Sequence, residues 1–247
     1  MRLTRLYTPQ PLASGATVTL DPRAAGHCAR VLRMRAGDAI VLFNGEGGEY
    51  QARLETVNRR EVRAEVGHFA AVSRESPLRV TLYQALARGE RMDYALQKAV
   101  ELGVGVIAPV ITRRCVVQLD ENRRERRMDH WTGVIISACE QSGRTRLPAL
   151  HPPMTLTQLL EAGSGKDARL RLVLHPEAQA GLAQLADRPD EVELLIGPEG
   201  GLDTAEIAAC RAAGFTPLRF GPRILRTETA GAAIVAALQS RWGDLDH

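Results

Sequence analysis

The chain has 247 residues, of which 45% are hydrophobic and 25% are charged, and its formal net charge is +3 at pH 7. This composition is typical of a globular protein with a buried core and excludes disordered and fibrous chains. No uncharged stretch reaches the ~18 apolar residues of a membrane span, and the first residues lack the apolar stretch of a secretory signal. We therefore expect a cytoplasmic protein with no membrane partner.

The four cysteines, at positions 28, 115, 139 and 210, are far apart in the sequence and form no C-x-x-C pair. No histidine accompanies them at the spacing of a zinc finger. We expect them to be small buried hydrophobic residues, and we expect no metal site.

Residues 1–72 have the pattern of a small β-barrel. The segments ATVTL, DAIVLFN, EYQARLETV and REVRAEVGHF alternate or are continuously apolar, and turn residues separate them. Asp21 as N-cap and Pro22 at the first helical position predict one short inserted helix. These residues contain 10 Arg and 7 acidic residues, so they carry the whole net charge of +3.

From about residue 73 strands alternate with long helices, which predicts a mostly parallel α/β sheet. The expected strands are RVTLYQAL, VGVIAPVIT, LRLVLHP, VELLIGPEGG and TPLRFG, and the expected helices span residues 91–102, 124–142, 204–213 and 229–242. We place the domains at residues 1–72 and 73–247.

The segment IGPEGGL follows an apolar strand and has three glycines in five positions. Its backbone can approach a ligand closely, and open α/β sheets bind ligands at the carboxyl ends of their strands. A turn that only reverses the chain is the alternative. Neither G-x-G-x-x-G nor a P-loop is present, which disfavours dinucleotide and nucleoside triphosphate enzymes.

Two further segments combine arginine with glutamate. FGPRILRTETA enters an apolar helix, and Thr227 or Thr229 as N-cap suits an anion or a polar cofactor tail. Ordinary helix capping is the alternative, which we rank lower because Arg223 and Arg226 have no obvious solvated face. ACEQSGR places Glu140 and Arg144 at a helix end, and from spacing alone a salt bridge explains them better.

Together with DYALQKAVELGV and VLRMRAGDAIVLFNGEGGEY, these three segments resemble the bacterial RsmE family, the 16S ribosomal RNA (uracil-N3) methyltransferases of the SPOUT class. The resemblance runs from Tyr7 to Leu238. It departs at Arg113, where an acidic residue is usual, and at Phe220, where leucine is usual.

The resemblance implies an α/β SPOUT methyltransferase domain with a C-terminal trefoil knot, a rare exception to the rule that chains do not knot, preceded by a PUA-like RNA-binding barrel. It also implies S-adenosyl-L-methionine as the cofactor, 16S rRNA within the small ribosomal subunit as the partner, and a homodimer with an active site between subunits. The helix at residues 229–242 fits such an interface because it has no charged residue before Arg241.

The resemblance also assigns residues to roles. The implied cofactor-binding residues are Leu174, His175, Pro176, Ile196, Gly197, Glu199, Gly200, Gly201, Leu218, Phe220, Gly221, Ile224, Leu225, Arg226 and Thr227. The expected RNA-binding residues are Arg5, His27, Arg30 and Arg33, because arginine neutralises phosphate.

Methylation of uracil at N3 requires the loss of a proton and a base held out of its stack. The candidate proton acceptors are Glu199, Glu140 and Glu228, and Arg144 and Arg226 are candidates for stabilising negative charge on the uracil oxygens. Which carboxylate acts, or whether the arginines suffice, stays open.

Two rival functions follow from the same segments. A SPOUT methyltransferase for transfer RNA or 23S rRNA would keep the cofactor loops, but the VLRMRAGD barrel argues against it. A catalytically silent RNA-binding factor in ribosome assembly would have no physical reason to keep the glycines and paired arginines of both loops.

Overall fold

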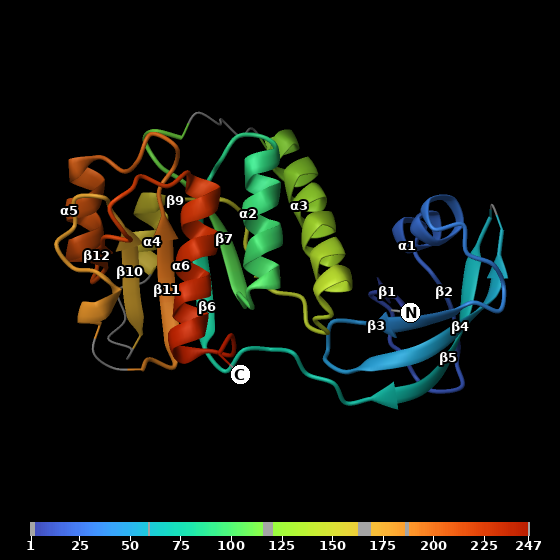
Figure 1. Cartoon of the computed structure of the whole chain (residues 1–247). Coiled ribbons are helices and arrows are strands. Elements are labelled where there is room, and N and C mark those ends of the chain that lie inside the picture. Colours follow the sequence, from blue (N-terminus) through green and yellow to red (C-terminus); the bar gives the residue numbers. More distant parts are fainter. Residues whose placement is uncertain (1–2, 59, 116–120, 163–168, 186–187, 247) are drawn as a thin grey trace. The chain divides into compact units, whose positions relative to one another are not determined.

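The computed structural model describes residues 3–58, 60–115, 121–162, 169–185 and 188–246 (Figure 1). The chain divides into two compact units. Unit 1 comprises residues 1–75 and 136–147, and unit 2 comprises residues 76–135 and 148–247. Among the described helices, none is long and apolar enough to cross a membrane.

Unit 1 is built on a five-stranded sheet in the order β1-β3-β4-β5-β2. The strands are β1 (Thr4–Tyr7), β2 (Thr17–Thr19), β3 (Ala39–Phe43), β4 (Glu49–Val57) and β5 (Val62–Ala70). The four segments expected from the sequence form β2 to β5. The pairs β2–β5, β3–β4 and β4–β5 are antiparallel. Strand β1 was not expected. It has only four residues, and its parallel partner β3 lies more than thirty residues later in the sequence. No turn next to β1 therefore indicates the pairing.

A short helix, α1 (Pro22–Gly26), follows β2, and the sequence predicted its start correctly. The Asp21 carboxylate accepts hydrogen bonds from the backbone N–H groups of Arg23 and Ala24 at 2.9 and 3.1 Å. This is the N-cap geometry that satisfies unpaired donors at a helix start. The chain continues directly into a π-helical turn, η1 (His27–Val31), whose Cys28 packs with Leu6 and Ile40 in the core of the unit.

Unit 2 contains a seven-stranded sheet in the order β12-β10-β11-β6-β7-β8, with β9 paired to β7. Its strands are β6 (Arg79–Ala85), β7 (Val106–Ile111), β8 (Ala149–Leu150), β9 (Met154–Thr155), β10 (Leu170–Leu174), β11 (Glu191–Ile196) and β12 (Thr216–Leu218). Every recorded strand pair of this sheet is parallel, as the alternation of strands and helices predicts.

Helices cover both faces of this sheet. They are α2 (Glu90–Glu101), α3 (Glu121–Ser142), α4 (Leu156–Ala162), α5 (Thr204–Ala212) and α6 (Thr227–Trp242), with a short 3-10 turn, η2, at Leu182–Gln184. Helices α2 and α6 lie side by side over one face (Figure 1). Residues of α4 and α5 pack with Val110, Val173 and Leu195 over the other. The sequence analysis missed α4, which has only seven residues, and it placed the start of α6 two residues late.

The order of the strands brings three loops to one edge of the sheet. Strand β10 lies between β12 and β11, and all three run in parallel. Leu174 is opposite Leu218, and Val173 is opposite Leu195, so the three strands end at the same level. The loops that follow Leu174, Ile196 and Leu218 therefore begin next to one another.

Candidate functional site

These three loops surround a pocket of about 680 Å3, a volume typical of small-molecule sites. Every residue that the sequence analysis assigned to the cofactor lines it. The lining also includes residues that were not assigned to the cofactor: Arg91, Arg114, Glu177, Pro198, Leu202, Arg219, Arg223 and Ala230. All lining residues belong to unit 2.

The glycine loop leaves little room for side chains. Gly201 has a φ of +68°, a conformation that side chains rarely adopt, and its N–H donates to the Pro198 carbonyl at 2.9 Å. A Cβ on Gly197 would lie 3.3 Å from Leu202 Cγ, and one on Gly200 would lie 3.2 Å from Arg114 Cβ. The glycines therefore keep this wall of the pocket as bare backbone, as the close-approach interpretation predicts.

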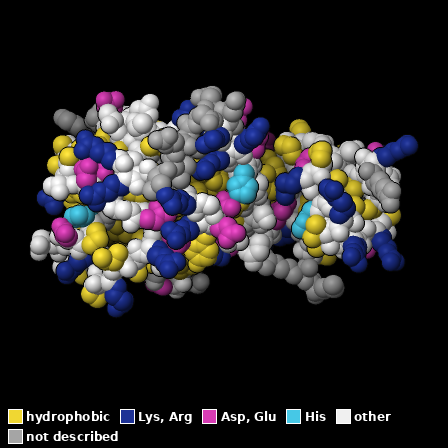
Figure 2. All heavy atoms as spheres, turned by 90° about the horizontal axis from the view of Figure 1, so that it is seen from above, with side chains coloured by type: hydrophobic (Ala, Val, Ile, Leu, Met, Phe, Trp, Pro, Cys, Tyr) yellow, Lys and Arg dark blue, Asp and Glu magenta, His cyan; other side chains and the backbone are white. Residues whose placement is uncertain are grey.

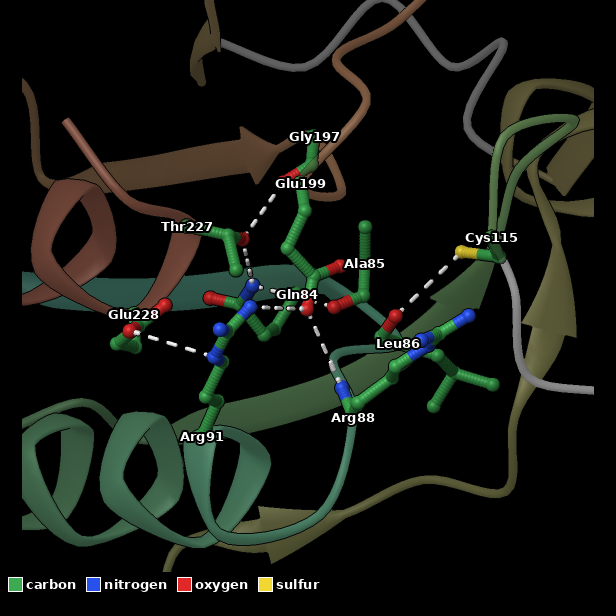
Figure 3. Close-up of polar contacts among 10 residues, drawn as sticks. All are labelled: Gln84, Ala85, Leu86, Arg88, Arg91, Cys115, Gly197, Glu199, Thr227 and Glu228. Atoms are coloured by element: carbon green, nitrogen blue, oxygen red, sulfur yellow. Dashed lines mark hydrogen bonds and ion pairs between the residues drawn. The ribbon is translucent and has the colours of Figure 1, made fainter. Parts of the chain in front are cut away.

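Thr227 connects the glycine loop to strand β6 (Figure 3). Its hydroxyl donates to the Gly197 carbonyl at 2.6 Å and accepts from the Gln84 amide at 2.9 Å. The expected N-cap roles of Thr227 and Thr229 are therefore wrong: Arg226 is the N-cap, with no side-chain cap bond. The Thr227 hydroxyl bonds to Gly197 and Gln84 in the tertiary structure instead of to a backbone N–H of its own helix.

Gln84 is fully buried, and the sequence analysis did not single it out. Its amide nitrogen holds Thr227, while its side-chain oxygen is buried without a hydrogen-bond partner among the described residues. The available signal was an amide near the carboxyl end of the strand segment RVTLYQAL, because a buried amide must find partners elsewhere in the fold.

A cluster of opposite charges forms one side of the pocket (Figure 3). Arg91 of α2 lies with Nη1 3.2 Å from Glu199 Oε1 and with Nε 4.0 Å from Glu228 Oε1. The backbone N–H of Arg88 donates to the same Glu199 oxygen at 3.4 Å. Arg91 thus connects the glycine loop with the first turn of α6, a role that no motif around it indicates.

These contacts set the protonation state of Glu199. Partial burial raises the pKa of this carboxyl, but backbone N–H donors at Glu199 and Arg88 and the Arg91 guanidinium outweigh that effect and lower the pKa below its usual 4.5. Glu199 is therefore a carboxylate at neutral pH. It can accept hydrogen bonds from a ligand or attract a cation, and it is a weak base.

Glu228 lies in the first turn of α6 and is 9% exposed. Its Oε2 is buried without a hydrogen-bond partner among the described residues. A helix N-terminus favours negative charge at this position. Glu228 does not line the pocket, and it reaches the lining through Arg91.

Glu140 and Arg144 are engaged within unit 1. Glu140 accepts from the backbone N–H of Tyr7 at 2.9 Å and from Arg23 at 2.8 Å. Arg144 is 3% exposed and pairs with Glu75, Nε to Oε1, at 3.2 Å. Glu140 and Arg144 thus form salt bridges, as expected of ACEQSGR, but with the remote residues Arg23 and Glu75. The catalytic roles of Glu140 and Arg144 stay predictions that these contacts do not favour.

The predicted RNA-binding residues differ in exposure. The Arg5 side chain is 7% exposed, pairs with Glu49 and lies over the Phe43 ring. These contacts give Arg5 a structural role in the unit, and its RNA-binding role stays a prediction that they do not favour. Arg30 and Arg33 are exposed, and His27 is partly buried.

Arg113 departs from the family pattern, and the structure shows how the fold accommodates it. Its guanidinium lies 3.1 Å from an Asp203 oxygen, and its backbone N–H donates to Glu206 at 2.8 Å. Asp203 and Glu206 form the capping box of α5. Among the residues that the structure describes, no cluster of His, Cys, Asp and Glu has the arrangement of a metal site.

The chain matches two families of domains. Residues 74–239 match the RNA methyltransferase domain, and residues 20–67 match the RNA methyltransferase PUA domain. The ribosomal RNA small subunit methyltransferase E of Buchnera aphidicola (subspecies Schizaphis graminum) is 31% identical over 99% of this chain and 98% of its own length. The chain belongs to the ribosomal RNA small subunit methyltransferase E family. The α/β fold and the PUA-like domain follow from this membership.

Solved structures of this family are similar throughout the chain. A methyltransferase E from Neisseria gonorrhoeae, bound to S-adenosyl methionine, is 38% identical, with a TM-score of 0.90 over 99% of this chain and all of that one. A protein from Legionella pneumophila, described as a methyltransferase with bound cofactor SAM, is 41% identical, with a TM-score of 0.95 over the same shares. In the present member of the family, the motifs IGPEGGL and FGPRILRTETA form the pocket.

Proposed function

We propose that this chain transfers a methyl group from S-adenosyl-L-methionine to N3 of a uridine in 16S rRNA of the small ribosomal subunit, in the cytoplasm. The pocket at the ends of β10, β11 and β12 carries the proposal, because its lining includes IGPEGGL and FGPRILRTETA, two of the segments that carry the family resemblance. The N. gonorrhoeae relative, which binds S-adenosyl methionine, supports the choice of cofactor.

The residues of the pocket fit this cofactor. Leu174 and the exposed Ile224 offer apolar surface for an adenine ring, and the bare backbone of the glycine loop offers hydrogen-bonding groups at close range. Glu199, held ionised, suits a cationic or hydroxyl donor.

When bound, the cofactor supplies an electrophilic methyl group. The chain must hold the uracil in line with it and favour the form of the base that has lost its N3 proton. We assign the stabilisation of negative charge on the uracil oxygens to Arg226, supported by the N-terminus of α6. Glu199 is assigned to binding, because a lowered pKa makes it a poor proton acceptor at neutral pH. Glu228 remains the candidate acceptor on this side of the pocket.

We also propose the finer architecture that the family resemblance implies. Residues 1–72 form the RNA-binding barrel, residues 73–247 form the methyltransferase domain, and the C-terminal segment passes through a preceding loop as a trefoil knot. The chain acts as a homodimer. The partly exposed alanines of α6 support this state, because they give the helix a second apolar face beside the one packed on α2. Sedimentation that gives one chain, near 26.9 kDa, at micromolar concentration would rule the dimer out.

Mass spectrometry of 16S rRNA tests the proposed reaction. RNA from a strain that lacks this gene is analysed before and after incubation with the purified protein and S-adenosyl-L-methionine. The proposal predicts a new methyl group at N3 of one uridine. Methylation of transfer RNA or 23S rRNA instead would favour the first rival function, and a protein that binds 16S rRNA without methylating it would favour the second.

A further inference from the structure

The turn that follows α1 presents two adjacent apolar side chains to solvent. Val31 is 67% exposed and Leu32 is 42% exposed, at the end of the π-helical turn η1. Exposed aliphatic side chains are common when single, but a neighbouring pair at the tip of a turn indicates a contact surface. We call residues 30–35 the apolar tip.

The apolar tip is held in one conformation by the core of unit 1. The Leu32 N–H donates to the His27 carbonyl at 2.9 Å, and the Met34 N–H donates to the Cys28 carbonyl at 3.0 Å. Cys28 is fully buried, and Met34 packs against the same core. Between these two bonds Arg33 adopts a φ of +52°, which is unfavourable for a residue with a side chain. The unit therefore tolerates strain to present Val31 and Leu32 in a fixed position.

Three exposed arginines lie within the apolar tip, beside Val31 and Leu32. Arg30, Arg33 and Arg35 are exposed, and within the described part of the chain their guanidinium groups form no recorded ion pair. Arg30 folds back over Gly26, where a Cβ would lie 2.6 Å from its Nη2. The nearby carboxylates are engaged, because Asp21 caps α1 and Asp38 accepts from the backbone N–H of Arg35. Figure 2, which views this unit from the side of α1, shows dark blue and yellow side chains next to one another.

We propose that Val31 and Leu32 pack against an unstacked base of the ribosomal RNA while Arg30, Arg33 and Arg35 bind the phosphates on either side. This inference rests on the proposed function and adds how the RNA is recognised. Bases expose apolar faces only when they leave the stack, and aliphatic side chains can take the place of a stacked neighbour. A phosphate backbone matches the unpaired arginines, whereas a protein surface would have to supply three carboxylates. The apolar tip therefore selects a loop or junction over a continuous duplex.

The two parts of the contact make separable contributions, which the full-length protein can reveal. Val31→Ser with Leu32→Ser removes the apolar contact and no charge. We expect affinity for unmethylated 16S rRNA to fall about tenfold, the order of one lost base contact, with the salt dependence unchanged. Arg30→Ala with Arg33→Ala should weaken binding and also reduce the salt slope, by about 1 for each arginine.

Leu3→Ser is the matched control, because Leu3 is another exposed leucine of unit 1, at 45% exposure, outside the apolar tip. It should bind 16S rRNA as the wild type does. Val31→Ser with Leu32→Ser should keep wild-type affinity for S-adenosyl-L-methionine, which confirms a folded protein, and for a continuous RNA duplex. Wild-type affinity of this variant for 16S rRNA would overturn the inference. If its sedimentation mass also differed from that of the wild type, the apolar tip would be a contact with a second copy of the chain. Because wild-type methylation is measured in parallel, failure of the proposed function would be visible separately.

Discussion

Glu199 and Glu140 are both candidate proton acceptors in the sequence, and in the structure each belongs to a glutamate–arginine cluster with different surroundings. Around Glu199, the carboxylate is 27% exposed and its partner Arg91 is 45% exposed, and both line the pocket of unit 2. Around Glu140, the carboxylate is 10% exposed, and it joins β1 to α1 through Tyr7 and Arg23. The first cluster faces a space large enough for a ligand, and the second connects segments of one unit.

The partners of the two carboxylates are alike, and exposure separates them. Each carboxylate accepts one backbone N–H and one arginine guanidinium from segments more than a hundred residues away in the sequence. Glu140 is the less exposed of the two, so its removal would leave its donors unsatisfied within the unit. Glu199 accepts from Arg88 and Arg91, at the rim of the pocket where water can replace it. Its loss should affect a ligand more than the fold.

The largest effect is expected for Glu140→Ala. Removing the acceptor of a partly buried ion pair and of the Tyr7 backbone N–H should lower the free energy of unfolding by about 2 kcal/mol. Affinity for S-adenosyl-L-methionine should stay that of the wild type at temperatures where the variant is folded. Urea denaturation and calorimetry measure the two quantities. A stable Glu140→Ala protein that has lost methyl transfer would instead give Glu140 a catalytic role.

Glu199→Gln should leave the stability of the fold unchanged and lower the affinity for the cofactor. It keeps the size of the side chain and removes its charge, so the free energy of unfolding should change by less than about 0.5 kcal/mol. The loss of one charge-assisted contact should reduce cofactor affinity about tenfold. Calorimetric titration with S-adenosyl-L-methionine checks this, and Glu140→Gln serves as the matched variant in unit 1. Equal cofactor affinities for wild type and Glu199→Gln would contradict the binding role.

The sequence predicted the elements whose signals are local. Asp21 with Pro22 predicted the start of α1 because this cap is made within three residues, and the helix expected at residues 204–213 begins at the predicted residue because the capping box of α5 is equally local. Strand β1 escaped because its partner is remote. The start of α6 was placed wrongly because the Thr227 hydroxyl bonds to Gly197 and Gln84 in the tertiary structure instead of capping the helix.

The residues of the candidate site also divide into those that a local sequence signal identifies and those that only the tertiary structure identifies. The glycine loop and FGPRILRTETA were found because their motifs are contiguous. Arg91 and Gln84 were missed because each lies in an ordinary helix or strand and acquires its role only from what the fold places beside it. Conversely, ACEQSGR is a distinctive motif, yet its charged residues Glu140 and Arg144 form ion pairs within unit 1.

The pH dependence of cofactor binding sharpens the assignment of Glu199. Its pKa is lowered in the folded protein, so the Glu199–Arg91 pair is intact at neutral pH and is lost only as the pH falls through that lowered value. The ratio of wild-type to Glu199→Gln affinity should be constant from pH 8 to pH 5, and should decline only below the usual carboxyl value of 4.5. A ratio that falls near pH 6.5 would indicate a raised pKa, as a general base requires.

The smallest effect is expected for Arg113→Ala. This side chain is 69% exposed, and its pair with Asp203 is open to solvent. Exposed ion pairs contribute little, so the free energy of unfolding should fall by about 0.5 kcal/mol or less, with normal methyl transfer. Thermal unfolding and the methylation assay measure both. A larger loss of methyl transfer would show that the departure from the family pattern at Arg113 matters for function.

Titration of Gly200→Val with S-adenosyl-L-methionine tests most directly that the pocket of unit 2 is the cofactor site. Valine would bring its Cβ within 3.2 Å of Arg114 Cβ and add a branched side chain to the bare wall of the pocket. Gly133→Val is the control, because a Cβ there meets no atom within 4 Å. We expect both variants to fold, Gly200→Val to lose measurable binding and Gly133→Val to bind as the wild type does. Wild-type affinity in a folded Gly200→Val protein would contradict the account.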